Sequence, residues 1–478
     1  MKITRLLGTA LAGLVLVPLA PGVAAHAAPE ASGTGGLEWR LCSEVANRWS
    51  PDDAETECAM VTVPVDYANP RGRTMDIAIN RLKASGTRRG VVLLNPGGPG
   101  GSGMGLPRSI RQSHAAGIGV HHDLIGFAPR GVSYSSAMMC DYDWTQPEPG
   151  LTEKEKARFE AERDGRRLRD CAARDPELAR NLTTADVARD MDRIRIALGE
   201  EKISYYGISW GSALGAHYRT MFDAHVDKML LDSVMAPDFD MIEMDHAQAT
   251  ARENTFAEFA AWVARHDDLY HFGATQGAVS RALLGLRERE LVRRDVFDGM
   301  ITSTRRYWPE MGRKLAELSR TTGPSAAPEA RQGALGWDET QTGFSSFQQS
   351  AVFCNESVGT RDFDEIWAAR ERRVAELPVS GAYGWYDVVC VGWPFPVQPW
   401  RLTAGSSPLQ LVGHLYEQVT PVRWAREMQQ RIGGALLVVE DDVHGSLSDL
   451  PCASAAVEFF DTGKVSNGSC AGAPLPSA

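Results

Sequence analysis

The fold of this chain is decided by one stretch, Tyr205-Tyr206-Gly207-Ile208-Ser209-Trp210-Gly211-Ser212-Ala213-Leu214-Gly215. Its centre, Gly-Ile-Ser-Trp-Gly, matches the G-x-S-x-G pattern of a serine nucleophile held on a sharp turn between a strand and a helix. Small residues flank such a serine because the turn is strained and the helix passes close to the strand. An ordinary glycine-rich turn has the same composition, so the interpretation depends on the rest of the chain.

Strand-like and helix-like segments alternate on both sides of this stretch. Short runs typical of strands occupy residues 90–94, 123–127, 202–206 and 229–232. Amphipathic runs typical of helices occupy residues 184–198 and continue from Ser212 onward. Alternation at this spacing predicts an α/β fold with a mostly parallel central sheet and flanking helices. Two earlier runs, 58–67 and 75–82, alternate as antiparallel strands do.

The pattern changes between residues 237 and 405, where amphipathic helical stretches with interspersed tryptophan and proline dominate. The strand signature returns at 409–413 and 435–439. We therefore predict a mainly helical cap inserted into the core and placed over the strand ends, where α/β enzymes bind ligands. The predicted division is residues 28–236 for the first part of the core, 237–405 for the cap and 406–478 for the second part of the core.

Length and composition limit the classes of protein to consider. The chain has 478 residues, is 43% hydrophobic and 23% charged, and carries a formal net charge of −11. A chain of this length can bury a large core, either as one domain with an insertion or as two domains. The acidic balance argues against nucleic acid as a partner.

The first 27 residues are predicted to be a secretory signal peptide. Lys2 and Arg5 precede an apolar segment at 6–19 that is short for a bilayer span, and Ala25-His26-Ala27 forms a cleavage site. A retained signal anchor is the alternative. Because no later apolar run has membrane length, we expect a secreted mature protein that starts at Ala28 and has no membrane partner.

Eight cysteines occur in the chain, at positions 42, 58, 140, 171, 354, 390, 452 and 470. An even number in an exported protein indicates disulfides, and eight cysteines allow 105 connectivities. The simplest connectivity joins neighbours along the chain. Metal binding is the alternative, but no Cys-x-x-Cys pair or Cys/His cluster has ligand spacing, so we predict no metal and no cofactor.

A glycine-rich segment, Asn95-Pro96-Gly97-Gly98-Pro99-Gly100-Gly101-Ser102-Gly103, directly follows the strand at 90–94. The amides of Gly97, Gly98 and Gly100 can approach a ligand closely and point at an oxygen that becomes negative. A phosphate loop would need a lysine that is absent here, and a dinucleotide fingerprint would need G-x-G-x-x-G spacing into a helix. A loop without a binding role is the remaining alternative.

A serine nucleophile needs a base to take its proton and a carboxylate to orient that base. In enzymes with this strand-turn-helix serine, the acid and then the histidine follow along the chain. His444 lies in a loop after the strand at 435–439, and Glu417 follows the strand at 409–413. A surface role is the alternative for each, and Asp232 is the rival acid. Asp441 and Asp442 are too close to His444 in sequence to orient it comfortably.

With these residues in view, the chain resembles the secreted tripeptidyl aminopeptidases, which are relatives of the proline iminopeptidases in the α/β-hydrolase superfamily. The segments that carry the resemblance are N-P-G-G-P-G-G-S-G (95–103), G-F-A-P-R-G (126–131), T-T-A-D-V-A-R-D-M-D (183–192), Y-Y-G-I-S-W-G (205–211), V-T-P (419–421) and D-V-H-G (442–445). They extend over nearly all of the mature chain.

The resemblance implies a serine exopeptidase that removes short peptides, tripeptides in particular, from free N-termini of peptides or proteins. Ser209 would form the acyl-enzyme, His444 would transfer the proton, and Glu417 would hold His444. An esterase or amidase on the same scaffold and a catalytically weakened binding homologue are the alternatives. The sequence does not determine the oligomeric state.

The resemblance also implies how the substrate would be held. The amides of Gly98 and Trp210 would form the oxyanion hole, with Gly97 as the alternative to Gly98. The substrate's free α-amine needs a negative partner, and Glu356, close to Cys354, is the candidate substrate-binding residue.

Three features depart from the family pattern. Ala128 replaces the usual Asp, and Ser133-Tyr134 replaces a Gly-Arg pair. The acid loop carries Glu417 in place of Asp and is one residue longer, through Tyr416. A longer carboxylate still reaches the histidine if the loop retreats by about one bond. An altered or weakened activity is therefore compatible with the sequence.

Overall fold

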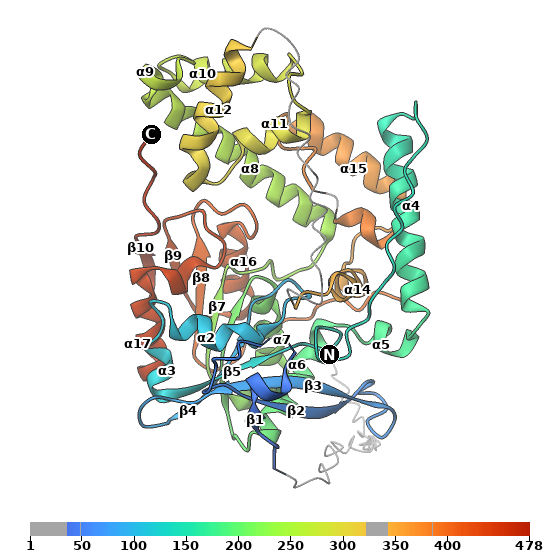
Figure 1. Ribbon diagram of the computed structural model, residues 1–478, viewed down its shortest axis with the longest axis vertical. Coiled ribbons are helices and arrows are strands. Elements are labelled where there is room, and N and C mark those ends of the chain that lie inside the picture. Colours follow the sequence, from blue (N-terminus) through green and yellow to red (C-terminus); the bar gives the residue numbers. More distant parts are fainter. Residues whose placement is uncertain (1–35, 48, 322–342, 385) are drawn as a thin grey trace, which may run out of the picture. The chain divides into compact units, whose positions relative to one another are not determined.

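The computed structural model describes residues 36–47, 49–321, 343–384 and 386–478 (Figure 1). The predicted signal peptide, residues 1–27, lies outside the described residues. Among the described helices, none combines the length and the apolar composition that crossing a membrane requires. Residues 37–478 form one compact unit, and this unit carries the sheet.

Within the described residues, ten strands form one sheet in the order β1-β2-β3-β5-β4-β6-β7-β8-β9-β10. Pairing is antiparallel from β1 to β5 and parallel from β5 to β10. This arrangement confirms the predicted mostly parallel sheet. The strands are β1 (Arg40–Leu41), β2 (Glu57–Pro64), β3 (Thr74–Leu82), β4 (Gly90–Asn95), β5 (His122–Phe127), β6 (Ile203–Ile208), β7 (Val226–Asp232), β8 (Leu409–His414), β9 (Ala435–Val439) and β10 (Gly468–Cys470).

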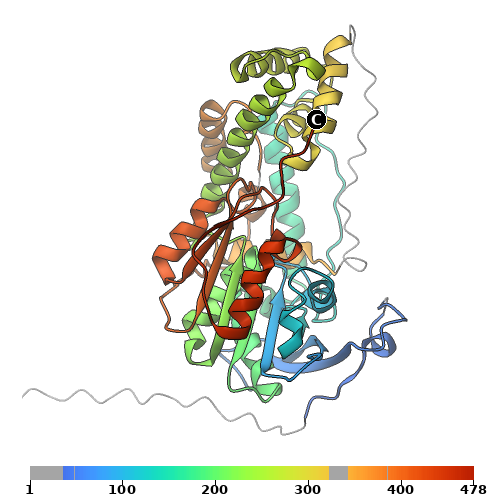
Figure 2. The same ribbon diagram turned by 90° about the vertical axis from the view of Figure 1, so that its left-hand side faces the viewer.

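Helices cover both faces of this sheet (Figures 1 and 2). Successive strand residues point to opposite faces, so Tyr205 packs in the core on one side and Tyr206 in the core on the other. Strands covered on both faces are apolar throughout, which is why 90–94 is a continuous apolar run. One face carries α6 (Thr184–Ala197), α7 (Trp210–Phe222) and α16 (Val422–Ile432), and the other carries α2 (Leu106–Arg111), α3 (Ile118–His121) and α17 (Ser454–Thr462).

A second group of helices, inserted between β7 and β8, has an apolar core of its own. It is built around Phe259, Trp262 and Trp308, all of which are fully buried. Figures 1 and 2 both show this group at one end of the sheet. The helices are α8 (Met241–Arg265), α9 (Asp267–Tyr270), α10 (Gln276–Arg287), α11 (Arg294–Ile301) and α12 (Trp308–Arg320). We refer to residues 241–320 as the cap helices.

Two elements cross the division expected from the sequence. Helix α14 (Ser346–Glu356) belongs to the insertion, yet it packs in the main core through residues such as Phe347 and Val352. Helix α4 (Glu153–Ala172) precedes the insertion, yet Lys154 and Arg158 pair with Asp364 at the start of α15 (Phe363–Glu376). Two further short α-helices in the described residues are α1 (Cys42–Val45) and α5 (Pro176–Arg180).

Four disulfides join cysteines that are neighbours along the chain: 42–58, 140–171, 354–390 and 452–470. This is the simplest of the connectivities that the sequence allowed. The 452–470 bridge ties the segment that follows His444 to β10 at the edge of the sheet.

Candidate active site

Ser209 occupies the sharp turn between β6 and α7. Its backbone has φ 60° and ψ −129°, a conformation that costs energy for any residue with a side chain. The glycines beside it allow the close approach, since a Cβ on Gly207 would lie 2.3 Å from the carbonyl oxygen of Gly211. Ser209 is 8% exposed, and its amide donates to the Asp232 carbonyl at 3.0 Å. The turn has the geometry that the sequence pattern predicted.

The glycine-rich loop after β4 lies directly against this turn. A Cβ on Gly97 would lie 2.8 Å from Ser209 Cβ and 2.9 Å from the nitrogen of Trp210. The Gly97 amide donates to Asn95 Oδ1 at 2.8 Å, so it is not available to a ligand, contrary to the expectation from the sequence. By contrast, the backbone amides of Gly98 and Trp210 donate no hydrogen bond to any group in the described part of the chain.

His444 and Glu417 are in direct contact. His444 Nδ1 is hydrogen-bonded to Glu417 Oε1, and the imidazole is 33% exposed whereas the carboxylate is buried. Oε1 also accepts from Thr420 Oγ1 at 2.7 Å and from the Thr420 amide at 3.1 Å, and Oε2 accepts from Ser233 Oγ at 2.9 Å. Because a carboxylate oxygen accepts, Nδ1 is the donor in this bond, and Nε2 is the ring nitrogen that Glu417 does not engage.

Ser233 links the acid loop to the histidine loop a second time. Its Oγ donates to Glu417 and accepts from the Gly445 amide at 2.8 Å. Ser233 directly follows β7, Glu417 follows β8, and His444 follows β9. Because the carboxyl ends of parallel strands meet at one edge, these loops lie at the same edge of the sheet as Ser209, which follows β6.

The rival acid, Asp232, has other partners. It is fully buried, and its carboxylate accepts from His414 Nε2 at 2.9 Å and from the Tyr206 hydroxyl at 3.3 Å. His414 Nδ1 contacts Asp441 Oδ1 at 2.7 Å, and Ser446 Oγ donates to the other Asp441 oxygen at 2.9 Å. This cluster was not predicted from the sequence, because one histidine at the end of an apolar strand carries no signal.

His414 carries a positive charge between two carboxylates. Burial by itself lowers the pKa of His414, but Asp232 and Asp441 outweigh it and raise the pKa to about 10. The cluster cross-links the ends of β7 and β9 beneath the loops that carry Glu417 and His444. The carboxylate of Asp232 is therefore engaged away from His444.

Glu356 is placed differently from what its predicted role requires. It is 2% exposed at the end of α14, and both carboxylate oxygens accept hydrogen bonds within the protein, from the amide and hydroxyl of Thr184 and from Trp400 Nε1. Burial raises the pKa of Glu356 to about 7, against the effect of these bonds. The indole of Trp210 donates to the Thr184 hydroxyl at 3.0 Å. Glu356 thus lies behind Trp210 and has no open side toward a substrate amine.

Two of the motifs that carried the resemblance meet in a buried ion pair. The Arg130 guanidinium donates to both oxygens of Asp190, at 2.6 and 2.7 Å, and the Tyr67 hydroxyl donates to the same carboxylate at 2.7 Å. The departure at Ala128 lies beside this pair, with its carbonyl accepting from Ser135 Oγ at 2.7 Å. Because Arg130 also donates to the Pro64 carbonyl, this ion pair holds the end of β2 to α6.

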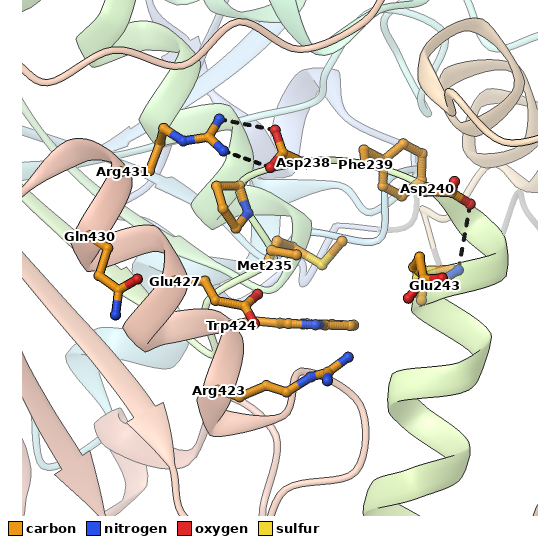
Figure 3. A pocket seen from close by; sticks show the side chains of 13 residues that line it. Met235, Asp238, Phe239, Asp240, Glu243, Arg423, Trp424, Glu427, Gln430 and Arg431 are labelled. Atoms are coloured by element: carbon orange, nitrogen blue, oxygen red, sulfur yellow. Dashed lines mark hydrogen bonds and ion pairs between the residues drawn. The ribbon is translucent and has the colours of Figure 1, made fainter. Parts of the chain in front are cut away.

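An open groove separate from these residues lies between α16 and the start of α8. Figure 3 shows Arg431 paired with Asp238 on one wall and Asp240 at the start of α8 on the other. Trp424 is among the lining residues, whereas Ser209, Glu417 and His444 are not.

The fold and the paired loops define an α/β hydrolase. The family model for the alpha/beta hydrolase fold matches residues 90–448, and the chain belongs to that family, as a serine hydrolase. More narrowly, the chain is 30% identical over 459 residues to the tripeptidyl aminopeptidase of Streptomyces lividans, covering 89% of this chain and 84% of that protein. It therefore belongs with the tripeptidyl aminopeptidases, as the sequence motifs indicated.

Two further relatives show the range of names in this family. The chain is 27% identical over 443 residues to the serine protease Hip1 of Mycobacterium tuberculosis, covering 85% of each chain. It is 28% identical over 461 residues to a protein named carboxylesterase B from the same organism, covering 88% of this chain and 87% of that one.

Proposed function

We propose that this protein is a secreted serine exopeptidase that releases short peptides, tripeptides in particular, from free N-termini. The observation that carries the proposal is the contact between His444 and Glu417 on neighbouring loops, at the edge of the sheet where Ser209 occupies a strained turn. The relatives named as a tripeptidyl aminopeptidase and a serine protease support the peptide bond as the target.

In the proposed reaction, Ser209 Oγ attacks the carbonyl carbon of the scissile peptide bond while His444 Nε2 takes the hydroxyl proton. Glu417 orients the imidazole and stabilises the imidazolium that forms. The amides of Gly98 and Trp210 donate to the negative oxygen of the tetrahedral intermediate. His444 then gives the proton to the departing amine, which leaves an acyl-enzyme on Ser209. Water activated by His444 hydrolyses the acyl-enzyme and releases the short peptide.

Secretion is part of the proposal. The predicted signal peptide at residues 1–27 directs the chain out of the cell, and the four disulfides are typical of proteins that function in an oxidising compartment. The disulfides hold the leading segment to the sheet and the last strand to the segment that follows His444.

The decisive experiment compares chromogenic tripeptides with free and with blocked N-termini, using the purified protein and its Ser209→Ala variant. The proposal expects turnover of the free substrates, much slower turnover of the blocked ones, and none by the variant. Equal cleavage of free and blocked substrates would remove the aminopeptidase assignment. Absence of both turnover and labelling by a serine-directed fluorophosphonate would indicate a binding homologue.

An esterase is the second candidate, and the relative named carboxylesterase B favours it. The burial of Glu356 also favours it, because the carboxylate expected to bind an α-amine is engaged with Thr184 and Trp400. Short acyl esters in the same assay separate the two candidates. If the ratio of kcat to KM for esters exceeds that for every free tripeptide by several orders of magnitude, the esterase assignment holds.

A further inference from the structure

The loop that carries Glu417 is hydrogen-bonded to the cap helices at several points. Gln418, the next residue, is 4% exposed. Its amide donates to Thr255 Oγ1 on α8 at 3.0 Å and to the carbonyl of Thr302, just after α11, also at 3.0 Å. One buried side chain on the acid loop thus joins two separate cap helices.

The cap reaches back to the same loop at a second point. Gln248 on α8 is 7% exposed, and its side-chain amide donates to the carbonyl of Val419 at 2.8 Å. Val419 lies two residues after Glu417. The acid loop thus donates to the cap through Gln418 and accepts from the cap at the Val419 carbonyl.

A third contact involves Tyr416, the residue that directly precedes Glu417. The guanidinium of Arg305 lies 3.4 Å from the centre of the Tyr416 ring. Glu258 on α8 holds that guanidinium with a 2.6 Å ion pair. The Arg305 amide donates to Asp442 Oδ2 at 2.6 Å, two residues before His444. Arg305 therefore contacts the acid loop and the histidine loop together.

These contacts surround Glu417 on both sides along the chain. The core supplies the hydrogen bonds to the carboxylate itself, from Ser233 and Thr420. The cap supplies the contacts that fix the backbone at Tyr416, Gln418 and Val419. A triad acid must be held to within about 0.5 Å for the imidazole to point at the nucleophile.

We propose that the cap helices are a positioning element for catalysis: through Gln248, Gln418 and Arg305 they hold Glu417 against His444, in addition to any part they have in covering the substrate. The inference rests on the proposed catalytic role of Glu417. It differs from a cap that contacts only the substrate, because it makes the reactivity of Ser209 depend on residues that no small substrate touches.

The test uses reagents too small to need the cap. Gln418→Ala, Gln248→Ala and Arg305→Ala are compared with wild type for the rate of fluorophosphonate labelling of Ser209 and for kcat and KM with p-nitrophenyl acetate. The matched control is Gln410→Ala. Gln410 is 3% exposed on β8, the strand that precedes the acid loop, and its amide donates to the carbonyls of Leu411, Ala435 and Ser466, outside the cap.

The labelling rate and kcat should fall by about 10-fold to 100-fold in the cap-contact variants, because a displacement of about 1 Å far from the chemistry has this effect. KM for the small ester should stay within about twofold, and Gln410→Ala should label at the wild-type rate after correction for its folded fraction. Tyr416→Phe, which keeps the ring beneath Arg305, should retain the rate that Tyr416→Ala loses.

Unchanged labelling in all three cap-contact variants, with only peptide KM raised, would overturn the inference. An equal loss in Gln410→Ala would also overturn it, since the effect would then be general destabilisation. Failure of the wild-type protein to label at all would instead overturn the proposed function. If one variant does not fold, the other two carry the comparison.

Discussion

Replacing His414 with glutamine should remove a part of the stability that depends on pH. His414 is fully buried and lies between two carboxylates, 2.9 Å from Asp232 and 2.7 Å from Asp441. Glutamine can donate one hydrogen bond but carries no charge, so the two carboxylates would face each other without a cation. Breaking a buried ion pair by removing one partner destabilises a protein by about 3–5 kcal/mol.

The direction of the pH effect follows from the pKa of His414, which the two carboxylates raise from 6.5 to about 10 against the effect of burial. A group whose pKa rises on folding stabilises the fold fully below its unfolded pKa and loses that contribution as the pH rises through its folded pKa. The contribution is therefore complete below pH 6.5 and gone above about pH 10. At about 1.36 kcal/mol for each pH unit, this window allows at most about 5 kcal/mol.

The assay is urea unfolding followed by tryptophan fluorescence, with the four disulfides intact. At about pH 6, the free energy of unfolding of His414→Gln should be about 3 kcal/mol below that of wild type. At about pH 9.5 the difference should shrink to about 1 kcal/mol, because most of the wild-type advantage is lost by then. A difference of equal size at both pH values would refute the reasoning, since His414 would then be neutral in the folded protein.

Three more predictions concern the proposed site. Glu417→Gln should lower kcat by about 10³-fold to 10⁴-fold, whereas Asp232→Asn should lower kcat far less. Steady-state kinetics measure both effects, and a larger loss of kcat in Asp232→Asn would make Asp232 the triad acid. Gly97→Ala should yield little folded protein, because its Cβ would lie 2.4 Å from the Ile208 carbonyl oxygen. A variant with the same melting temperature as wild type, measured by circular dichroism, would contradict this prediction. Replacing both Cys452 and Cys470 with alanine should lower the free energy of unfolding by about 3 kcal/mol and should also reduce kcat. If neither value changes, this disulfide does not stabilise the His444 loop.

Much of the architecture could be predicted because its signals are local. The apolar run at 90–94 must be covered on both faces whatever its neighbours are, so it indicates a central parallel strand. Ser209 has a local signature too, since only small residues on either side permit the turn. Neighbouring cysteines pair here because the segments between them fold back over short distances.

The partners of side chains far apart in the chain could not be predicted in the same way. Asp232 and Glu417 both follow strands, and the sequence does not state which carboxylate meets His444. In the structure the choice depends on His414, which engages Asp232 and leaves Glu417 to the histidine loop. Glu356 was expected to face a substrate, but the packing of α14 in the main core buries it against Thr184.

The sequence by itself determined the strands, the strained turn at Ser209 and the chain order of serine, acid and histidine, because each of these depends on the spacing of residues within one segment. Only the tertiary structure decided which carboxylate contacts His444, and that the cap helices contact the acid loop. The physical reason is that these outcomes depend on competition for hydrogen-bond partners. His414 takes Asp232 and leaves Glu417 to His444, and such competition exists only when distant segments have been brought into contact.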